Sequence, residues 1–202
     1  MLKPRWGSGS FGIEYVWAMD ELALVHALAT RRYARSIIPD RRMAAPDASL
    51  LIQERLPGAE YGLDIVNDLE GRYVCTLAKR KLLMRSGETD RAVTTHHAGL
   101  VQLGAQLGDL LGPVGILDCD VFVHGDTCVV LEMNPRFGGG YPFSHAAGAN
   151  IPAALVAWAR GEMPNPAWLT FAPCVTASKY DRVAVLETDN AAMLDTWREG
   201  ET

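Results

Sequence analysis

Hydrophobic and polar residues alternate along two neighbouring segments, residues 116–123 and 129–134, and this pattern predicts a β-hairpin. The side chains of a strand point alternately to its two faces, so each segment places its polar groups on one face. The first segment carries Ile116, Asp118, Asp120 and Phe122 on a shared face, and the second carries Val130, Glu132 and Asn134. Residues 124–127 (HGDT) provide the turn between the strands.

The polar face of this hairpin is a set of hard oxygen donors. Carboxylate and amide oxygens are the ligands that Mg²⁺ takes, especially where phosphates supply the remaining positions. Arg136 follows directly and offers a planar fork for an oxyanion. The alternative interpretation is an ordinary hairpin with a solvated polar face.

The turn decides which side chains of the hairpin face one another. A two-residue loop at Gly125 and Asp126 would pair Cys119 with Glu132. A three-residue loop, or one β-bulge, would pair Asp120 with Glu132 instead. Because a metal site shared by both strands requires the second register, we predict that Asp120 and Glu132 face one another.

The rest of the pattern predicts strands and helices in mixed order. Strands are expected at residues 13–17, 50–53, 61–67, 72–78 and 174–187, and helices at residues 21–35, 97–111, 151–160 and 190–198. Asp20 is the expected cap of the first helix. Loops are expected at residues 39–49 and 85–94, and residues 162–174 are expected to be irregular. Since the strands and helices do not alternate regularly, the predicted fold class is α+β.

Composition narrows the classes of protein. With 202 residues, 49% of them hydrophobic, the chain can bury a substantial core in one domain or two small lobes. A net charge of −5 gives no electrostatic indication of a nucleic-acid partner. No apolar run reaches the roughly 18 residues that a membrane span needs. The four cysteines lack CxxC spacing and the first residues lack an apolar signal region, so we expect a reduced, cytoplasmic protein.

Residues 7–12 (GSGSFG) match the pattern G-x-G-x-x-G. Glycines allow the backbone to approach a phosphate and to direct several amides at it. The dinucleotide-binding version needs a strand before the loop and a helix after it, whereas a strand is predicted here at residue 13. A protein-kinase loop also precedes a strand, but the chain has no HRD or DFG sequence. A flexible N-terminal stretch is the alternative.

Other polar segments suit a nucleotide and its phosphates. The backbone of residues 54–56 can read an adenine edge, and Glu60 can accept hydrogen bonds from two ribose hydroxyls. A cationic region around residues 87–89 suits a polyphosphate; it comprises Lys79, Arg80, Lys81, Arg85 and Arg91. For all of these residues a solvated surface is the alternative. Residues 138–140 (GGG) lie between aromatic residues, and we expect the backbone to pass close to a substrate there.

Five segments appear in the order typical of the ATP-grasp superfamily: KPRWGSGSFGI, LLIQERLPGAEYGLDIV, RSGET, LDCDVF and LEMNPRFGGGYP. Residues 2–160 thus resemble this superfamily, most closely the branch of the carbamoyl phosphate synthetase large subunit, which has an E-x-N-P-R segment at its metal site. The resemblance implies an ATP-grasp fold with two lobes that clasp a nucleotide. Residues 1–52 would form the small lobe with the glycine-rich loop, residues 53–165 the large lobe with the metal site, and residues 166–202 an extension of the large lobe. The N-terminal domain that precedes these lobes in the family is expected to be absent.

The resemblance also implies roles for individual residues. Lys3 and Arg136 would be the catalytic cations, Lys3 at the ATP phosphates and Arg136 at the substrate carboxylate or acyl phosphate. The implied metal ligands are Asp120, Glu132 and Asn134. The implied ATP-binding residues are Lys3, Gly7, Ser8, Gly9, Ser10, Gly12, Glu54, Leu56, Glu60 and Arg85.

The activity that the resemblance implies is an ADP-forming ligase that joins a carboxylate to an amine or another nucleophile through an acyl phosphate. ATP is expected with one or two Mg²⁺ ions, or with Mn²⁺ in their place. The expected substrates are small molecules, with neither a nucleic acid nor a membrane as partner. A missing N-terminal domain, a partner subunit or a second copy of the chain would complete the assembly. The alternative is a non-catalytic nucleotide-binding module, or a truncated or split-gene fragment that needs a partner domain.

Overall fold

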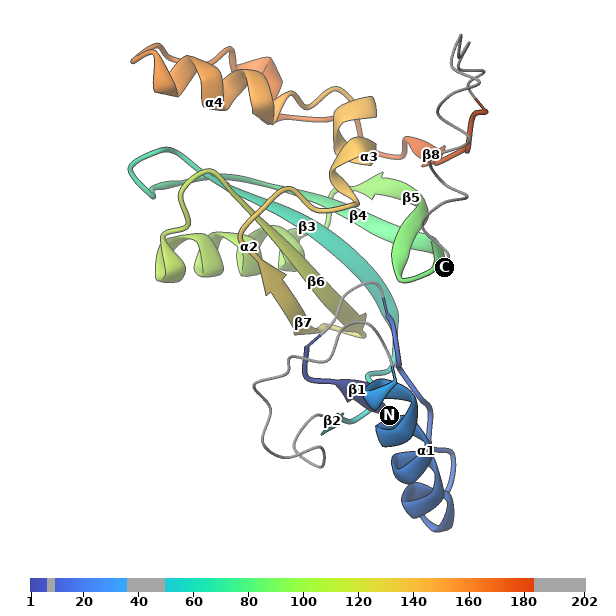
Figure 1. Cartoon of the computed structure of the whole chain (residues 1–202). Helices are drawn as coiled ribbons and strands as arrows, with labels where there is room; N and C mark the ends of the chain where they lie inside the picture. Colours follow the sequence, from blue (N-terminus) through green and yellow to red (C-terminus); the bar gives the residue numbers. More distant parts are fainter. Residues whose placement is uncertain (7–9, 36–49, 184–202) are drawn as a thin grey trace, which may run out of the picture.

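The computed structural model describes residues 1–6, 10–35 and 50–183. Their strands form two separate sheets, one of two strands and one of six (Figure 1). The small sheet lies with helix α1 at one end of the molecule, and the large sheet carries the remaining helices (Figure 1). The expected α+β class agrees with this arrangement.

The small sheet pairs two segments that are far apart in the sequence. Strand β1 (Leu2–Pro4) runs antiparallel to β2 (Leu50–Ile52). A short 3-10 turn, η1 (Met19–Glu21), leads into helix α1 (Leu22–Ala34). Leu2, Ala29 and Leu50 form the buried centre of this part.

The large sheet has the strand order β7-β6-β3-β4-β5-β8, with every neighbouring pair antiparallel. Its strands are β3 (Ala59–Asn67), β4 (Tyr73–Arg85), β5 (Glu88–Thr95), β6 (Ile116–His124), β7 (Thr127–Asn134) and β8 (Thr176–Ser178). Because β3 lies between β6 and β4, the hairpin of β6 and β7 and the hairpin of β4 and β5 meet across a single strand.

The two faces of this sheet have different cover. Helix α2 (Ala98–Leu111) packs on one face through a cluster that includes Leu63, Leu100 and Val121. Helices α3 (Tyr141–Ala146) and α4 (Ile151–Ala159) lie on the other side (Figure 1). They bury only part of that face, with the 3-10 turn η3 (Pro166–Leu169) beside α4. Polar side chains occupy the remainder of it.

Most of the elements predicted from periodicity are confirmed. The hairpin at residues 116–134, the strand pair β3 and β4, and helices α1, α2 and α4 all form within a few residues of the expected bounds, although β4 extends to Arg85. His97 caps α2 by accepting from the Leu100 amide, and Asn150 caps α4. None of the described helices is both long enough and apolar enough to cross a membrane.

The prediction of a polar loop at residues 85–94 is wrong. Only Ser86 and Gly87, both with positive φ, form a turn there, and β5 begins at Glu88. Thr89, Ala92 and Thr94 are buried in this strand. Threonine is β-branched and fits a strand, so the polar composition of residues 85–94 is compatible with a partly buried strand.

Several smaller expectations also need correction. Within residues 13–17 the contact with a strand is a single bridge from Glu14 to Leu2. Leu50 is buried in β2, but Ile52 is 64% exposed, so this strand is covered at one end only. Helix α1 begins at Leu22 without a side-chain cap, and Glu21 rather than Asp20 accepts from the preceding backbone amides. In the expected strand at 174–187, β8 covers three residues. Residues 39–49 and 190–198 lie outside the described residues.

Contact between α2 and β4 requires glycine at position 104. A Cβ there would lie 2.1 Å from Oγ1 and 2.7 Å from Cγ2 of Thr76. We expect Gly104→Ala to lower the free energy of unfolding by about 2 kcal/mol, because overpacking forces the helix and strand apart. Urea unfolding would measure this loss. In a Thr76→Ala background the same substitution should cost less than half as much, and equal costs in the two backgrounds would contradict this packing account.

Candidate functional site

The hairpin of β6 and β7 adopts the predicted register. Asp120 lies opposite Glu132, and Asp118 lies opposite Asn134. The loop is the two-residue type, with His124 paired to Thr127, and the register shifts at a bulge between Asp120 and Val121. The bulge therefore moves Glu132 from Cys119, its partner in an unbroken two-residue hairpin, to Asp120.

A band of charge crosses the uncovered face of the sheet from β4 to β6. The Lys81 ammonium on β4 donates to Glu60 Oε1 on β3 at 2.6 Å and reaches Asp120 Oδ2 on β6 at 2.7 Å. Lys81 spans the intervening strand where that strand carries Gly62. A Cβ on Gly62 would lie 3.4 to 3.8 Å from Lys79, Lys81 and Asp120, so glycine leaves the two lysine stems room to cross.

Electrostatics hold Lys81 in its charged form. Its side chain is 7% exposed, and such burial by itself lowers the pKa of an amine. The carboxylates of Asp120 and Glu60 more than offset this effect, so the pKa of Lys81 lies above its ordinary value. The ammonium is therefore a stabilised positive charge beside the predicted metal ligands.

A second lysine on β4 forms a fully buried ion pair one step along the sheet. Lys79 Nζ lies 2.6 Å from Asp64 Oδ2, and both side chains are at most 1% exposed. Ser144 on α3 donates to the same oxygen at 2.6 Å. A Cβ at Gly140 would lie 2.6 Å from Lys79 Cε. The pair thus supports both α3 and the glycine segment that precedes it.

The glycine segment also passes directly over Asp118. Arg136 Nη1 donates to Asp118 Oδ2 at 3.0 Å, and a Cβ at Gly138 would lie 2.1 Å from Asp118 Oδ1. Burial raises the pKa of Asp118, and the charge of Asp120 raises it further, while Lys79 and Arg136 act in the opposite direction. Residues 138–140 therefore make the expected close backbone approach, but to the protein's own Asp118 carboxylate. The same carboxylate fixes the position of Arg136.

One cavity of about 1240 Å³ lies between the small sheet and the large one, and its lining includes Glu60, Lys79, Lys81, Asp118, Asp120 and Arg136. Of the residues predicted for the site, the cavity brings together Lys3, Ser10, Glu54, Leu56, Glu60, Asp120, Glu132, Asn134 and Arg136. Within the described chain, Gly12 and Arg85 do not line it. Arg85 forms ion pairs with Asp90 and Asp181 instead. Gly7, Ser8 and Gly9 lie outside the described residues.

Gly12 has a local role beside the cavity. Its φ is +72°, and a Cβ would lie 2.8 Å from Cγ of Pro4. Only glycine adopts this backbone without strain and lets the chain turn back against β1. The conformation explains this glycine without a ligand.

The donor set fits Mg²⁺ only with help from a ligand. Within the described part of the chain, no three side chains among His, Cys, Asp and Glu gather as a metal-binding group. Asp120 and Glu132 supply two carboxylates, and the Asn134 amide, which donates to Glu132 Oε1 at 3.3 Å, adds an oxygen. Mg²⁺ commonly uses one or two carboxylates and completes its shell with phosphates and water, so these residues fit a metal that arrives with phosphate.

Sequence reasoning missed the buried part of the site. In the sequence Lys79 and Lys81 belong to a charged run, for which a solvated face is the usual outcome, and no motif marks Asp64 or Ser144. The available signal was spacing: Lys79 and Lys81 alternate on β4, and Glu60, Gly62 and Asp64 alternate on β3.

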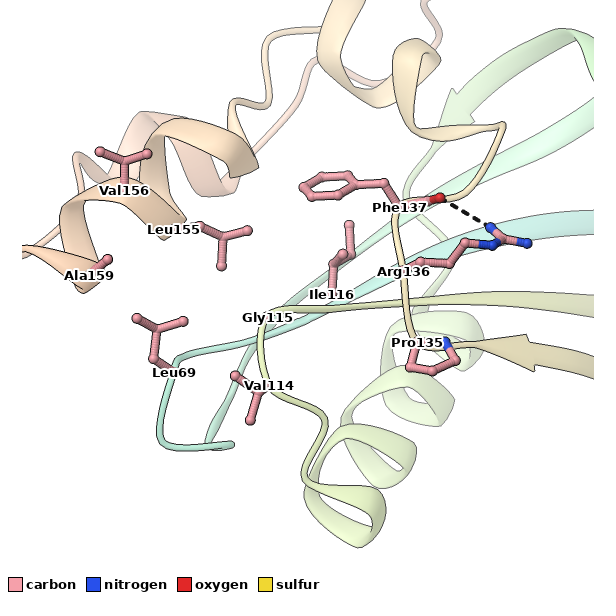
Figure 2. A pocket seen from close by; sticks show the side chains of 10 residues that line it. All are labelled: Leu69, Val114, Gly115, Ile116, Pro135, Arg136, Phe137, Leu155, Val156 and Ala159. Carbon is pink, nitrogen blue, oxygen red and sulfur yellow. Dashed lines mark hydrogen bonds between the residues drawn. The ribbon is translucent and has the colours of Figure 1, made fainter.

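A second, apolar cavity of about 430 Å³ lies behind the Pro135–Phe137 turn. Figure 2 shows the Phe137 ring directed into it, near Leu155 and Ile116, while the Arg136 side chain extends away. Arg136 also donates to the Phe137 carbonyl at 3.1 Å. The turn therefore separates an apolar hollow from the charged cavity.

Comparison with known proteins gives a family match. Residues 47–181 match the family model described as "ATP-grasp in the biosynthetic pathway with Ter operon". The matched range covers β2 through β8 and includes the whole large sheet. No curated protein matches the sequence.

Solved structures share the fold at low sequence identity. Three solved structures each align with 84% of this chain, with a TM-score of 0.62. The first is the biotin carboxylase domain of Hydrogenobacter thermophilus 2-oxoglutarate carboxylase, solved with MgADP, ADP and bicarbonate, at 14% identity. The second is a Rhizobium etli pyruvate carboxylase solved with acetyl coenzyme A, at 15% identity. The third is the Campylobacter jejuni biotin carboxylase–beta-gamma-ATP complex, at 13% identity. The chain spans 38%, 16% and 39% of their respective lengths. The likeness confirms the predicted fold.

The buried pair of Lys79 and Asp64 should be needed for stability. Lys79→Met leaves an uncompensated carboxylate at a position with no solvent access, and we expect a loss of about 3 kcal/mol in the free energy of unfolding. Denaturant unfolding would measure this loss. Lys79→Met combined with Asp64→Asn removes both charges and should recover most of it. An equally unstable double variant would show that packing of the lysine stem, not charge pairing, is what matters.

Proposed function

Because this chain belongs to the family described as "ATP-grasp in the biosynthetic pathway with Ter operon", we propose that it is an ATP-dependent ligase that joins a carboxylate to an amine. One observation carries the proposal. Oxygen donors on β6 and β7 lie on one wall of a cavity whose opposite wall carries Lys3 and the segment between β2 and β3. This arrangement suits a nucleotide whose base and phosphates lie at different ends of one cleft.

Each end of the cavity suits a different part of ATP. Glu54 and Leu56 lie in the connection from the small sheet to the large one, where backbone groups can read the adenine edge. Glu60, at the start of β3, would accept from the ribose hydroxyls. Lys3 and Ser10 line the same cavity from the small sheet and its following loop, and would contact the phosphates. These assignments come from the family resemblance and are supported by the shared cavity.

Asp120, Glu132 and Asn134 would hold magnesium, with manganese as an alternative ion. Bound there, the ion would neutralise negative charge on the phosphates and polarise the terminal phosphoryl group. The protein's own contribution is to fix two carboxylates and one amide in a register that the bulge imposes.

The proposed chemistry has two steps. An oxygen of the substrate carboxylate attacks the γ-phosphorus of ATP, and the bond to the bridging oxygen breaks, giving an acyl phosphate and ADP. The amine then attacks the acyl carbon, loses a proton and expels phosphate, which leaves a C–N bond. Arg136, positioned by Asp118, would hold the anionic carboxylate and stabilise the charge that develops on the phosphoryl group.

The chain matches only part of each structural relative, and this favours the alternative of a nucleotide-binding module that needs a partner domain. It spans less than two fifths of each of these three structures, so a further domain or partner subunit would be needed to complete the substrate site. In that case the chain is a nucleotide-binding module without activity of its own. The same proposal includes a small-molecule carboxylate and a small-molecule amine as substrates. It also includes a second copy of the chain as a partner. The branch related to carbamoyl phosphate synthetase also stays a prediction.

Nucleotide binding distinguishes these functions from a chain without a working site. Calorimetric titration with a nonhydrolysable ATP analogue should give binding that tightens about tenfold or more when Mg²⁺ is added. Glu132→Gln should abolish the magnesium effect, because it removes one of two carboxylate ligands. Glu162→Gln, an exposed glutamate remote from the cavity, is the matched control and should behave as the natural chain does.

A magnesium effect that survives in Glu132→Gln would contradict the assigned metal site. Binding without any turnover of a carboxylate and amine library would favour the nucleotide-binding module. Absence of binding in both conditions would overturn both functions for this chain.

A further inference from the structure

Lys81 connects two carboxylates to which the proposed function gives different tasks. Its ammonium lies 2.6 Å from the proposed ribose acid, Glu60, and 2.7 Å from a proposed metal ligand, Asp120. The lysine side chain is 7% exposed, and the two acids are 24% and 18% exposed. The contacts are therefore short, shielded from solvent and strongly electrostatic.

An ammonium in this place competes with a divalent cation. Asp120 Oδ2 cannot be shared at full strength between Lys81 and Mg²⁺, and a fixed positive charge at this distance repels a second cation. Phosphates bring several negative charges to the same place and remove that repulsion. Lys81 thus weakens the metal site when the nucleotide is absent and is compatible with it when the nucleotide is present.

We propose that Lys81 is an internal counter-ion that keeps divalent metal out of the Asp120 site until a nucleotide is bound. This inference rests on the proposed function and adds an order of loading to it: metal enters with the nucleotide phosphates and not before them. Lys81 is a positioning residue in this account, since it acts through Asp120 and Glu60.

The surrounding residues hold the lysine at this position. Gly62 leaves room for its stem to cross β3, and Lys79 is already committed to Asp64 and Ser144. Lys79 therefore cannot take over neutralisation of Asp120 without breaking a buried pair. Arg136 is similarly engaged with Asp118. Among the described residues, Lys81 is the cation that forms an ion pair with Asp120.

Binding of Mn²⁺ in the absence of nucleotide tests the inference directly. The concentration of free Mn²⁺, measured by electron paramagnetic resonance, gives the dissociation constant of Mn²⁺ from the whole chain without any turnover. Lys81→Met should bind Mn²⁺ about tenfold or more tightly than the natural chain. Adding a nonhydrolysable ATP analogue should then tighten Mn²⁺ binding by a smaller factor in Lys81→Met than in the natural chain.

Two variants serve as controls. Arg80→Met removes the same charge from the adjacent residue of β4, which is exposed and points to the other face, and should leave Mn²⁺ binding unchanged. Lys81→Met combined with Asp120→Asn should lose the gain, which locates the new affinity at Asp120. Circular dichroism would establish that each variant is folded, and Lys81→Arg, which keeps the charge, provides a second comparison with weak Mn²⁺ binding.

The outcomes separate this inference from the proposed function. Equal Mn²⁺ affinity in the natural chain and Lys81→Met, with nucleotide still tightening metal binding in both, would overturn the role of Lys81 and leave the proposed function in place. Equal gains in Arg80→Met and Lys81→Met would reduce the effect to net charge and also overturn it. No Mn²⁺ binding to any variant, with or without nucleotide, would remove the metal site and both proposals with it.

Discussion

The site depends on the pairing of two lysines of β4 with carboxylates on the neighbouring strand β3 and on β6 beyond it. Lys79 is committed to Asp64 and Lys81 to Glu60 and Asp120, and all of these groups are wholly or largely removed from water. Taking such charges out of water is costly unless each finds an opposite charge at short range. The antiparallel register of β3, β4 and β6 provides that range, and Gly62 provides the space.

This charged band is possible because the sheet has two unlike faces. One face is closed by α2 with apolar side chains, and contact there is close enough that Gly104 and Gly108 leave no room for a Cβ. Close packing on that face sets the positions of the strands, so the opposite face can hold polar groups at defined separations. α3 and the glycine segment before it cover the deepest of those groups, and the cavity begins where that cover ends.

Shared use of the same residues links the predicted subsites to one another. The bulge that brings Glu132 opposite Asp120 also sets Asn134 opposite Asp118, and Asp118 in turn holds Arg136. A substitution at one of these positions therefore alters the geometry of the others through short contacts. The match over residues 47–181 contains the six-stranded sheet and its side of the cavity, whereas the opposite wall with Lys3 and Ser10 lies outside that range.

Local pattern in the sequence determined the hairpin of β6 and β7, helices α2 and α4, and the oxygen-donor set, because each depends on neighbouring residues and a short repeat. The order of five motifs predicted the ATP-grasp superfamily, which the family match over residues 47–181 confirms. The tertiary structure alone decided that Thr89, Ala92 and Thr94 form a buried strand, that Arg85 turns away to Asp90 and Asp181, and that Lys79 and Lys81 are interior charges. The physical reason is that burial and pairing of a side chain are set by strands distant in sequence. Strand β3 is the case in point: its partners on both sides, β4 and β6, come together only when the whole sheet forms.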